Sequence, residues 1–117
     1  EEISMIEMDG VAGSQVTVLS FGITAAVAAY AVEIARASGL RVGMVRLITL
    51  WPFNDRAISQ VARETGALIV AEMNLGQIVH EVRRAVEGRV PVHFLGNPGG
   101  AIIEPETIAA KILEVAQ

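Results

Sequence analysis

Few side chains in this sequence are of the kinds that carry out catalysis or bind metals. The 117 residues include no cysteine and only two histidines, His80 and His93. Without thiolates, the chain offers no disulfide, no cysteine nucleophile and no cysteine ligand for zinc or an iron–sulfur cluster. No serine lies in a G-x-S-x-G motif. We interpret His93, in an apolar strand, as structural, and His80, beside two arginines, as part of a solvated helix face rather than a small anion patch.

Glu72 is the carboxylate at the most polar end of a predicted strand. It could serve as an acid, a base or a hydrogen-bond anchor. A carboxylate without a partner acid, histidine or metal ligand is a weak catalytic signal. The alternative is that Glu72 and Asn74 cap the following helix and brace neighbouring loops. We favour this structural interpretation, and we predict no catalytic, cofactor-binding or metal-binding residue in the chain.

Two glycine-containing loops could bind a phosphate group. Residues 22–24 join a strand to a helix, whose N-terminal amides attract anions. Residues 96–100 could form a nest of backbone amides. The alternatives, which we favour, are a tight turn in which Thr24 caps the helix and a flexible connector. A nucleotide- or phosphate-binding module is thus the alternative function, with the candidate residues Gly22, Thr24, Gly96, Gly99 and Gly100.

The only tryptophan lies in a third loop, formed by Trp51, Pro52 and Phe53. A rigid apolar loop at a sheet edge suits a protein interface, because tryptophan is enriched among the residues that dominate binding energy. The alternative is that the aromatic side chains fold over the domain's own core. We favour a subunit interface and include Asn74 and Gln77 from the next loop.

The elements that must position these loops follow a regular βα rhythm. The β-type runs are 16–20, 41–50, 67–72 and 90–95, and each is followed by helical spacing. Helices are expected from about Thr24 to Ser38, from Asn54 or Asp55 to before Gly66, from Gln77 to Glu87, and from near Pro105 onward. This rhythm is typical of an α/β domain in which helices join parallel strands. Ligands of such sheets bind beyond the carboxyl ends of the strands, where all these loops would lie.

The first predicted helix is unusually apolar, since Glu33 and Arg36 are its only charges between Ala25 and Ala37. A helix that is apolar nearly all round is usually buried on more than one side. Its second side would be covered by another subunit, or its small alanines are tolerated at the surface; both interpretations stay open. The uncharged run after Asp9 is long enough to span a bilayer. Glycine, serine and threonine interrupt it, and we expect a buried strand followed by a buried helix.

Composition limits the partners of the chain. The net charge is −4, hydrophobic residues make up 52% and charged residues 19%, which predicts one folded domain over residues 1–117. A mildly acidic chain with scattered arginines lacks the overall positive electrostatic potential that would attract nucleic acid or an anionic membrane. No signal peptide is visible, so we expect a cytoplasmic protein. The start, Glu1-Glu2-Ile3, is typical of a fragment of a longer subunit.

Taken together, the loops resemble those of a known family. A strand ends Ser-Phe-Gly at 20–22, Val-Arg-Leu-Ile-Thr-Leu-Trp-Pro-Phe spans 45–53, Val-Ala-Glu-Met-Asn-Leu-Gly-Gln spans 70–77, and a glycine-rich segment precedes the last helix. From Val16 to Gln117 the sequence resembles the C-terminal domain of the alpha subunit of 2-oxoacid:ferredoxin oxidoreductases, especially the 2-oxoglutarate type. It is similar more broadly to the transketolase C-terminal domain. It departs from the family pattern at Asn54, where a second proline is frequent, and after Gly100, where prolines are spaced differently.

The resemblance implies a three-layer α/β/α domain with a mostly parallel, five-stranded sheet, in which residues 3–8 would form an antiparallel edge strand. It also implies an assembly role in an enzyme that oxidatively decarboxylates a 2-oxoacid to an acyl-CoA. Thiamine diphosphate, Mg²⁺, iron–sulfur clusters and coenzyme A would be bound elsewhere in that complex. The implied partners are a beta subunit and ferredoxin, in a hetero-oligomer, and this chain alone would be inactive.

Overall fold

The computed structural model describes residues 5–49, 53–73, 77–96 and 103–117. Strands and helices alternate along the chain in the predicted order. The elements are β1 (Ile6–Asp9), β2 (Val16–Phe21), α1 (Ile23–Ala37), β3 (Val42–Leu47), α2 (Asp55–Glu64), β4 (Leu68–Glu72), α3 (Gln77–Val86), β5 (Val92–Gly96) and α4 (Pro105–Ala116). β3 is shorter than the predicted run 41–50, because the chain has left the sheet by Ile48.

The five strands form one sheet in the order β1-β3-β2-β4-β5. The pairs β2–β3, β2–β4 and β4–β5 are parallel, and β1 pairs with β3 in the antiparallel direction, with Met8 opposite Val45. The mostly parallel sheet with one antiparallel edge strand is therefore confirmed. Two-residue turns can join only antiparallel strands, so the parallel pairs require the helical crossovers seen here.

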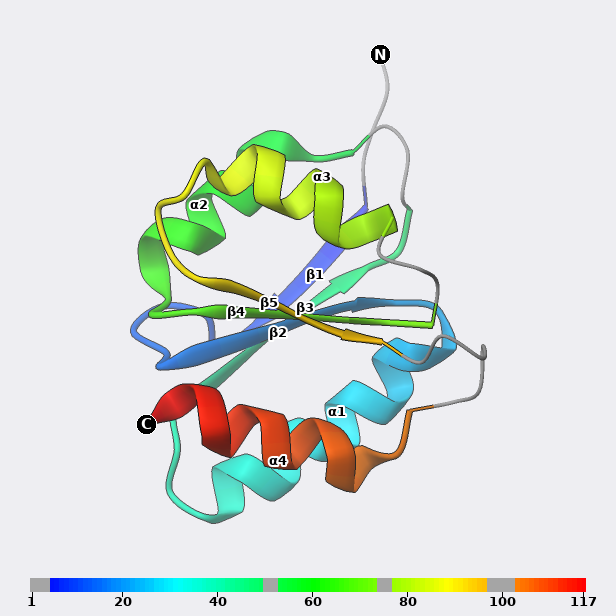
Figure 1. The fold of residues 1–117 in the computed structure, drawn as a ribbon, viewed down its shortest axis with the longest axis vertical. Helices are drawn as coiled ribbons and strands as arrows, with labels where there is room; N and C mark the ends of the chain where they lie inside the picture. The colour runs from blue at the N-terminus through cyan, green and yellow to red at the C-terminus, as the bar shows by residue number, and fades with distance from the viewer. Residues whose placement is uncertain (1–4, 50–52, 74–76, 97–102) are drawn as a thin grey trace.

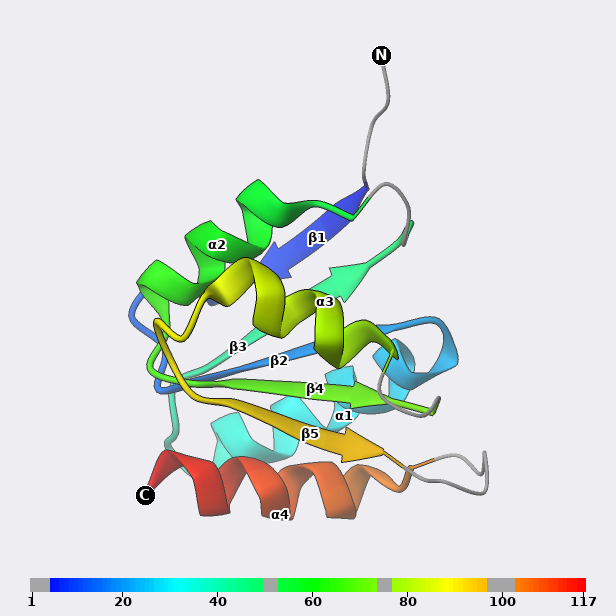
Figure 2. The same cartoon turned by 45° about the horizontal axis from the view of Figure 1, so that its top comes forward.

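Helices cover both faces of the sheet and make three layers (Figure 1). α2 and α3 pack on one face, and α1 and α4 pack on the other (Figure 2). Side chains alternate between the faces along each strand; in β2, Leu19 joins the core beneath α2 and α3, whereas Val16 and Val18 join the core beneath α1 and α4. β2 and β4 are almost continuously apolar because both of their faces are buried.

The uncharged run after Asp9 is resolved into β2 and α1, as expected. No helix in the described ranges combines the length and the apolar character that a membrane crossing requires.

Two predicted helix starts have different outcomes. Asn54 is the N-cap of α2, since its Oδ1 accepts a hydrogen bond of 3.0 Å from the amide of Ala57. The prediction that Thr24 is the N-cap of α1 is wrong, because the helix begins at Ile23 and Gly22 is the N-cap.

A polar cluster closes the amino edge of the sheet. The buried hydroxyl of Ser14 lies 2.7 Å from that of Thr65 and 3.0 Å from that of Thr17. Gly43 of β3 packs directly against this edge, where an added Cβ would lie 2.8 Å from the Cα of Val11 and 2.6 Å from the Oγ1 of Thr17. Satisfied polar groups and close backbone packing indicate a structural role for this edge.

Candidate functional site

The carboxyl edge of the sheet brings the predicted loops together, as expected for parallel strands. Phe21 pairs with Leu47 at the ends of β2 and β3, and Glu72 pairs with Gly96 at the ends of β4 and β5. α1, α2 and α3 begin after these strand ends (Figure 2). Several predicted site residues lie outside the described residues, namely Trp51, Pro52, Asn74, Gly99 and Gly100.

Glu72 is a buried helix cap. Its side chain is only 2% exposed, and its carboxylate accepts hydrogen bonds from the amide of Ile78 at 3.1 and 3.2 Å and from the amide of Val79 at 3.1 Å. The first amides of a helix have no partner within the helix, and a negative charge there also interacts favourably with the helix dipole. Both oxygens of Glu72 thus stabilise α3, which confirms the interpretation of this residue as a cap. Buried in this way, Glu72 is poorly placed to exchange a proton with a substrate.

The turn into α1 depends on glycine. Gly22 has a φ of 69°, in the left-handed region that other residues rarely adopt, and an added Cβ would meet nothing within 4 Å. Thr24 is buried in the first turn of α1. At the other glycine loop, a Cβ on Gly96 would collide with the ring of Phe94 and lie 3.2 Å from the backbone oxygen of Glu72. The backbone conformation at Gly22 and the close packing at Gly96 therefore each explain why glycine is present. Phosphate binding at these loops stays a prediction.

Ser20, the last residue but one of β2, carries an unusual side chain. Its side chain is fully buried, and its hydroxyl has no hydrogen-bond partner within the described part of the chain. In the register of the sheet it lies between Arg46 of β3 and Ala71 of β4. A buried hydroxyl without a partner loses its hydrogen bonds to water, at a cost of roughly 1–3 kcal/mol. This feature was not predictable from the sequence, because the missing partner of the hydroxyl is a property of the packing.

Of the predicted interface residues, Phe53 and Gln77 can be located. Phe53 is half-buried and packs against the core beneath α2 and α3. Gln77 is the first residue of α3 and is exposed at the carboxyl edge. Phe53 thus agrees with the alternative interpretation, in which the aromatic side chains fold over the domain's own core. Gln77, in contrast, is accessible to a partner. The role of the two residues in an interface stays a prediction.

An ion pair between Asp55 and Arg84 joins α2 to α3. Two nitrogens of the Arg84 guanidinium donate to the two carboxylate oxygens of Asp55, at 2.8 and 2.9 Å, and one of these nitrogens also contacts Glu81 at 2.6 Å. Hydrogen bonding to Arg84, helped by its charge, holds the pKa of Asp55 below its usual value of 3.8, while the two carboxylates raise the pKa of Arg84. All three side chains are substantially solvent-exposed, so the pair is screened.

Titratable side chains do not gather into a catalytic or metal-binding constellation in the described ranges. No group of three or more histidine, aspartate or glutamate residues there could hold a metal ion. His80 is exposed on α3, in line with its interpretation as part of a solvated face, and His93 is half-buried in β5. Among the described residues, the carboxyl edge offers capped helix starts, with Gly22 and Gln77 exposed.

The sequence of this framework decides the family. Residues 14–108 match the family described as pyruvate:ferredoxin oxidoreductase core domain II. The chain belongs to this family. The predicted resemblance to oxidoreductase subunits is therefore confirmed, and a relative among curated proteins agrees: the 2-oxoglutarate synthase subunit KorA of Methanothermobacter thermautotrophicus is 36% identical over 115 residues, which is 98% of this chain and 31% of that subunit. This core domain II chain thus spans about a third of the length of its relative.

Solved structures agree with the fold of this core domain II chain. A 2-oxoglutarate:ferredoxin oxidoreductase from Magnetococcus marinus, with 2-oxoglutarate, coenzyme A and succinyl-CoA bound, superposes with a TM-score of 0.86 at 27% identity, over 97% of this chain and 20% of that chain. A split-gene transketolase, in an inactive beta4 tetramer, superposes with a TM-score of 0.74 at 23% identity, over 94% and 41% of the two chains. The second likeness concerns the fold alone and confirms the transketolase-like architecture.

Proposed function

We propose that this chain is the assembly domain of the alpha subunit of a cytoplasmic 2-oxoacid:ferredoxin oxidoreductase. The observation that carries the proposal is family membership, in combination with a carboxyl edge whose most suggestive side chain, Glu72, serves as a helix cap. The complex would decarboxylate a 2-oxoacid on thiamine diphosphate with Mg²⁺, transfer the acyl group to coenzyme A and pass electrons to ferredoxin. 2-Oxoglutarate is the substrate suggested by the name of the KorA relative.

The residues of this chain are a poor fit for the cofactors of such a complex. The sequence has no cysteine, so the thiolates that hold iron–sulfur clusters must come from other parts of the complex. The described residues contain no carboxylate cluster suited to Mg²⁺. We therefore assign no catalytic step to this chain. Its contribution is to hold the carboxyl-edge loops, including those with Trp51 and Gln77, against a beta subunit.

The test is subunit association. Trp51→Ala and Gln77→Ala are introduced into the alpha subunit that carries this domain, which is then expressed with its beta subunit. Weaker co-purification and a parallel loss of 2-oxoacid-dependent ferredoxin reduction are expected, because both residues would lie in the contact. Gln60→Ala on α2 is the matched control, since Gln60 is exposed and lies in the second turn of α2, outside the carboxyl-edge loops. Full association of both variants would refute an interface at these loops.

A thermal-shift panel on the chain distinguishes an assembly domain from the alternative function, a phosphate-binding module at Gly22 and Thr24. The ligands are coenzyme A, ATP, NAD, thiamine diphosphate with Mg²⁺, and simple 2-oxoacids. A ligand at about 100 times its Kd adds roughly 2.7 kcal/mol to the free energy of unfolding. In a domain of this size the Tm would then rise by roughly ten degrees or more. A flat panel is the result expected for an assembly domain, and a clear rise with one ligand would move the function to the glycine loops.

A further inference from the structure

An open groove of about 630 Å³ lies along α2 and α3, which pack side by side on one face of the sheet (Figure 2). Four exposed arginines line it. Arg56 and Arg63 come from α2, Arg84 comes from α3, and Arg89 comes from the segment after α3. We call it the α2–α3 groove. It presents four guanidinium groups in a chain whose net charge is −4.

The basic side chains outside this groove are engaged by the fold. Six of the nine basic residues of the chain donate a hydrogen bond to a described residue or form an ion pair with one, namely Arg36, Arg41, Arg46, Arg83, Arg84 and Lys111. The remaining three are Arg56, Arg63 and Arg89. Within the described ranges these three have no acidic partner, and all three line the α2–α3 groove. Unpaired positive charge is therefore concentrated at one place on the surface.

Helix stability explains only part of this arrangement. Arg63 lies in the last turn of α2 and Arg89 follows the end of α3, where a cation interacts favourably with the helix dipole. Arg56 is the second residue of α2, and a cation at the start of a helix opposes the dipole. An anion bound in the groove would account for all three arginines.

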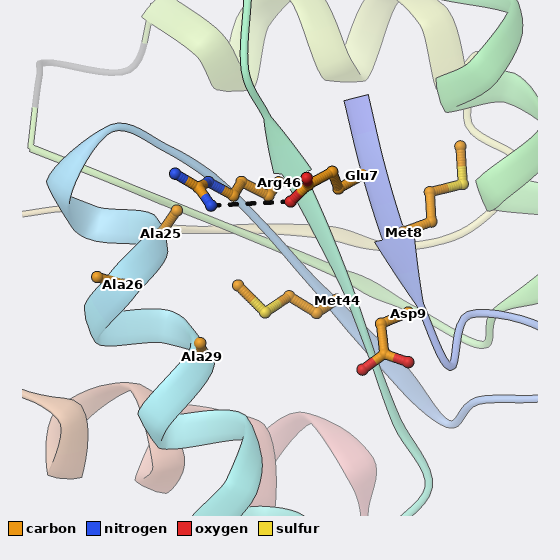
Figure 3. Close-up of a pocket in the computed structure, with 8 residues that line it drawn as sticks. All are labelled: Glu7, Met8, Asp9, Ala25, Ala26, Ala29, Met44 and Arg46. Carbon is orange, nitrogen blue, oxygen red and sulfur yellow. Dashed lines mark ion pairs between the residues drawn. The ribbon is translucent and has the colours of Figure 1, made fainter. Parts of the chain in front are cut away.

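The groove between α1 and the strands β1 and β3 differs in charge (Figure 3). Arg46 is the one basic residue among the described residues that line it, and it pairs with Glu7 at 3.7 Å (Figure 3). Asp9, which also lines it, pairs with Arg36 at 3.1 Å. The charged side chains of that groove thus have partners already, whereas the α2–α3 groove keeps three arginines available.

We propose that the α2–α3 groove binds an acidic segment of a partner protein, whose carboxylates pair with Arg56, Arg63 and Arg89. The groove already contains one such contact, since two nitrogens of Arg84 donate to the two carboxylate oxygens of Asp55 at 2.8 and 2.9 Å. A planar guanidinium matches a carboxylate in this bidentate geometry. The proposal goes beyond the assembly role above, because it assigns a second contact surface that two helices form.

The layout of the groove favours an extended acidic segment over a compact phosphate. Arg56 and Arg63 are seven positions apart on one helix face, which is about 10 Å along α2. Alternate side chains of an extended segment lie about 6–7 Å apart, so successive carboxylates can meet separate arginines. A compact phosphate would have to draw both guanidiniums together beside the carboxylates of Asp55 and Glu87, which line the same groove.

Nucleic acid is a poorer match for this surface. The chain is acidic overall, whereas a nucleic-acid-binding domain is usually basic. The described residues that line the groove include no aromatic side chain on which a base could stack. The charge complementarity therefore points to a protein segment that carries several carboxylates.

Fluorescence anisotropy with a labelled oligoglutamate peptide tests the proposal on the full chain. A peptide of about ten residues is long enough to span the groove at roughly 3.3 Å per residue. The wild-type chain should bind it saturably at low ionic strength, and added salt should weaken binding because the contacts are exposed. The triple variant Arg56→Gln, Arg63→Gln and Arg89→Gln should bind about tenfold or more weakly. Failure of the wild-type chain to bind would overturn the proposal.

Two controls separate the groove from overall charge. The triple variant Arg41→Gln, Arg46→Gln and Lys111→Gln loses the same three charges outside the groove and should bind the peptide like the wild-type chain. Gln60→Ala removes an uncharged side chain that lines the groove, and it should also leave binding unchanged. An equal loss of affinity in the two triple variants would show that net charge alone governs binding, and the proposal would be wrong.

Competition distinguishes the two anion chemistries. Unlabelled oligoglutamate should displace the labelled peptide at a lower concentration than inorganic tripolyphosphate does. Displacement by tripolyphosphate at the lower concentration would identify the groove as a phosphate site and would contradict an acidic protein segment.

The groove and the carboxyl-edge loops can fail separately. Trp51→Ala and Gln77→Ala lie outside the groove and should keep peptide binding at the wild-type level. If peptide binding depends on the three arginines but these two variants leave association with the beta subunit intact, the groove stands and the proposed role of the loops fails. If the wild-type chain ignores the peptide but the loop variants lose the beta subunit, the assembly role stands and the groove proposal is wrong.

Discussion

The carboxylate of Glu72, the last residue of β4, accepts hydrogen bonds from the backbone amide of Ile78 in the first turn of α3, at 3.1 and 3.2 Å. Six positions of chain separate the two residues, so this contact closes the loop between strand and helix. The cap also reaches the amide of Val79. The start of α3 is therefore held to the end of β4 by one buried side chain, in addition to the packing of its apolar face on the core.

Replacement of Glu72 should lower stability in a graded way. Glu72→Ala leaves two helix amides without an acceptor and should reduce the free energy of unfolding by about 1–3 kcal/mol. Glu72→Gln keeps one acceptor oxygen and should lose less. Urea unfolding followed by circular dichroism measures both, with the exposed Glu114→Ala on α4 as the control. Equal stability of Glu72→Ala and the wild-type chain would contradict the cap.

Ser20→Ala should stabilise the protein. The hydroxyl is buried without a partner in the described ranges, so its removal should raise the free energy of unfolding by about 1 kcal/mol. Ser38→Ala is the contrasting variant, because the Ser38 hydroxyl donates to the carbonyl oxygen of Ala35 at 2.9 Å. That substitution should lower stability by about 0.5–1 kcal/mol. A loss of stability in both variants would mean that Ser20 has a partner.

The Asp55–Arg84 pair should add a small acid sensitivity. The pKa of Asp55 is lower in the folded chain than its usual 3.8, so the pair stabilises the fold above pH 3.8 and loses this contribution as the pH falls through the folded value. In Asp55→Asn this part of the pH dependence of the Tm should be absent. Because the side chains are exposed, the difference should shrink in high salt. A salt-independent difference would contradict a screened surface pair.

Two glycines should respond differently to alanine. At Gly43 a Cβ would press on the backbone of Val11, which cannot move away easily, and Gly43→Ala should cost about 1–3 kcal/mol. Gly88 has a φ of 74° but open space around it, so Gly88→Ala should cost only about 1 kcal/mol of backbone strain. Thermal unfolding ranks the two variants. The reverse order would show that the amino edge is looser than the close approach implies.

Much of this architecture was predictable from short stretches of sequence. Apolar periodicity located the strands and helices, Asn54 marked the start of α2, and Pro105 marked the start of α4. The loop motifs at 45–53 and 70–77 indicated the family. Such features are encoded locally, because the period of a helix or strand and the chemistry of a cap involve residues a few positions apart.

Other features were decided only by the tertiary structure. Asp55 and Arg84 are 29 positions apart and meet because α2 and α3 pack side by side. The missing partner of Ser20 and the exposure of Tyr30 and Ile34 on α1 depend on which surfaces the neighbouring elements cover. The sequence showed that α1 is apolar nearly all round, but only the packed fold shows which of its faces is left exposed. Burial and pairing between distant segments follow from the whole chain, so local patterns could not specify them.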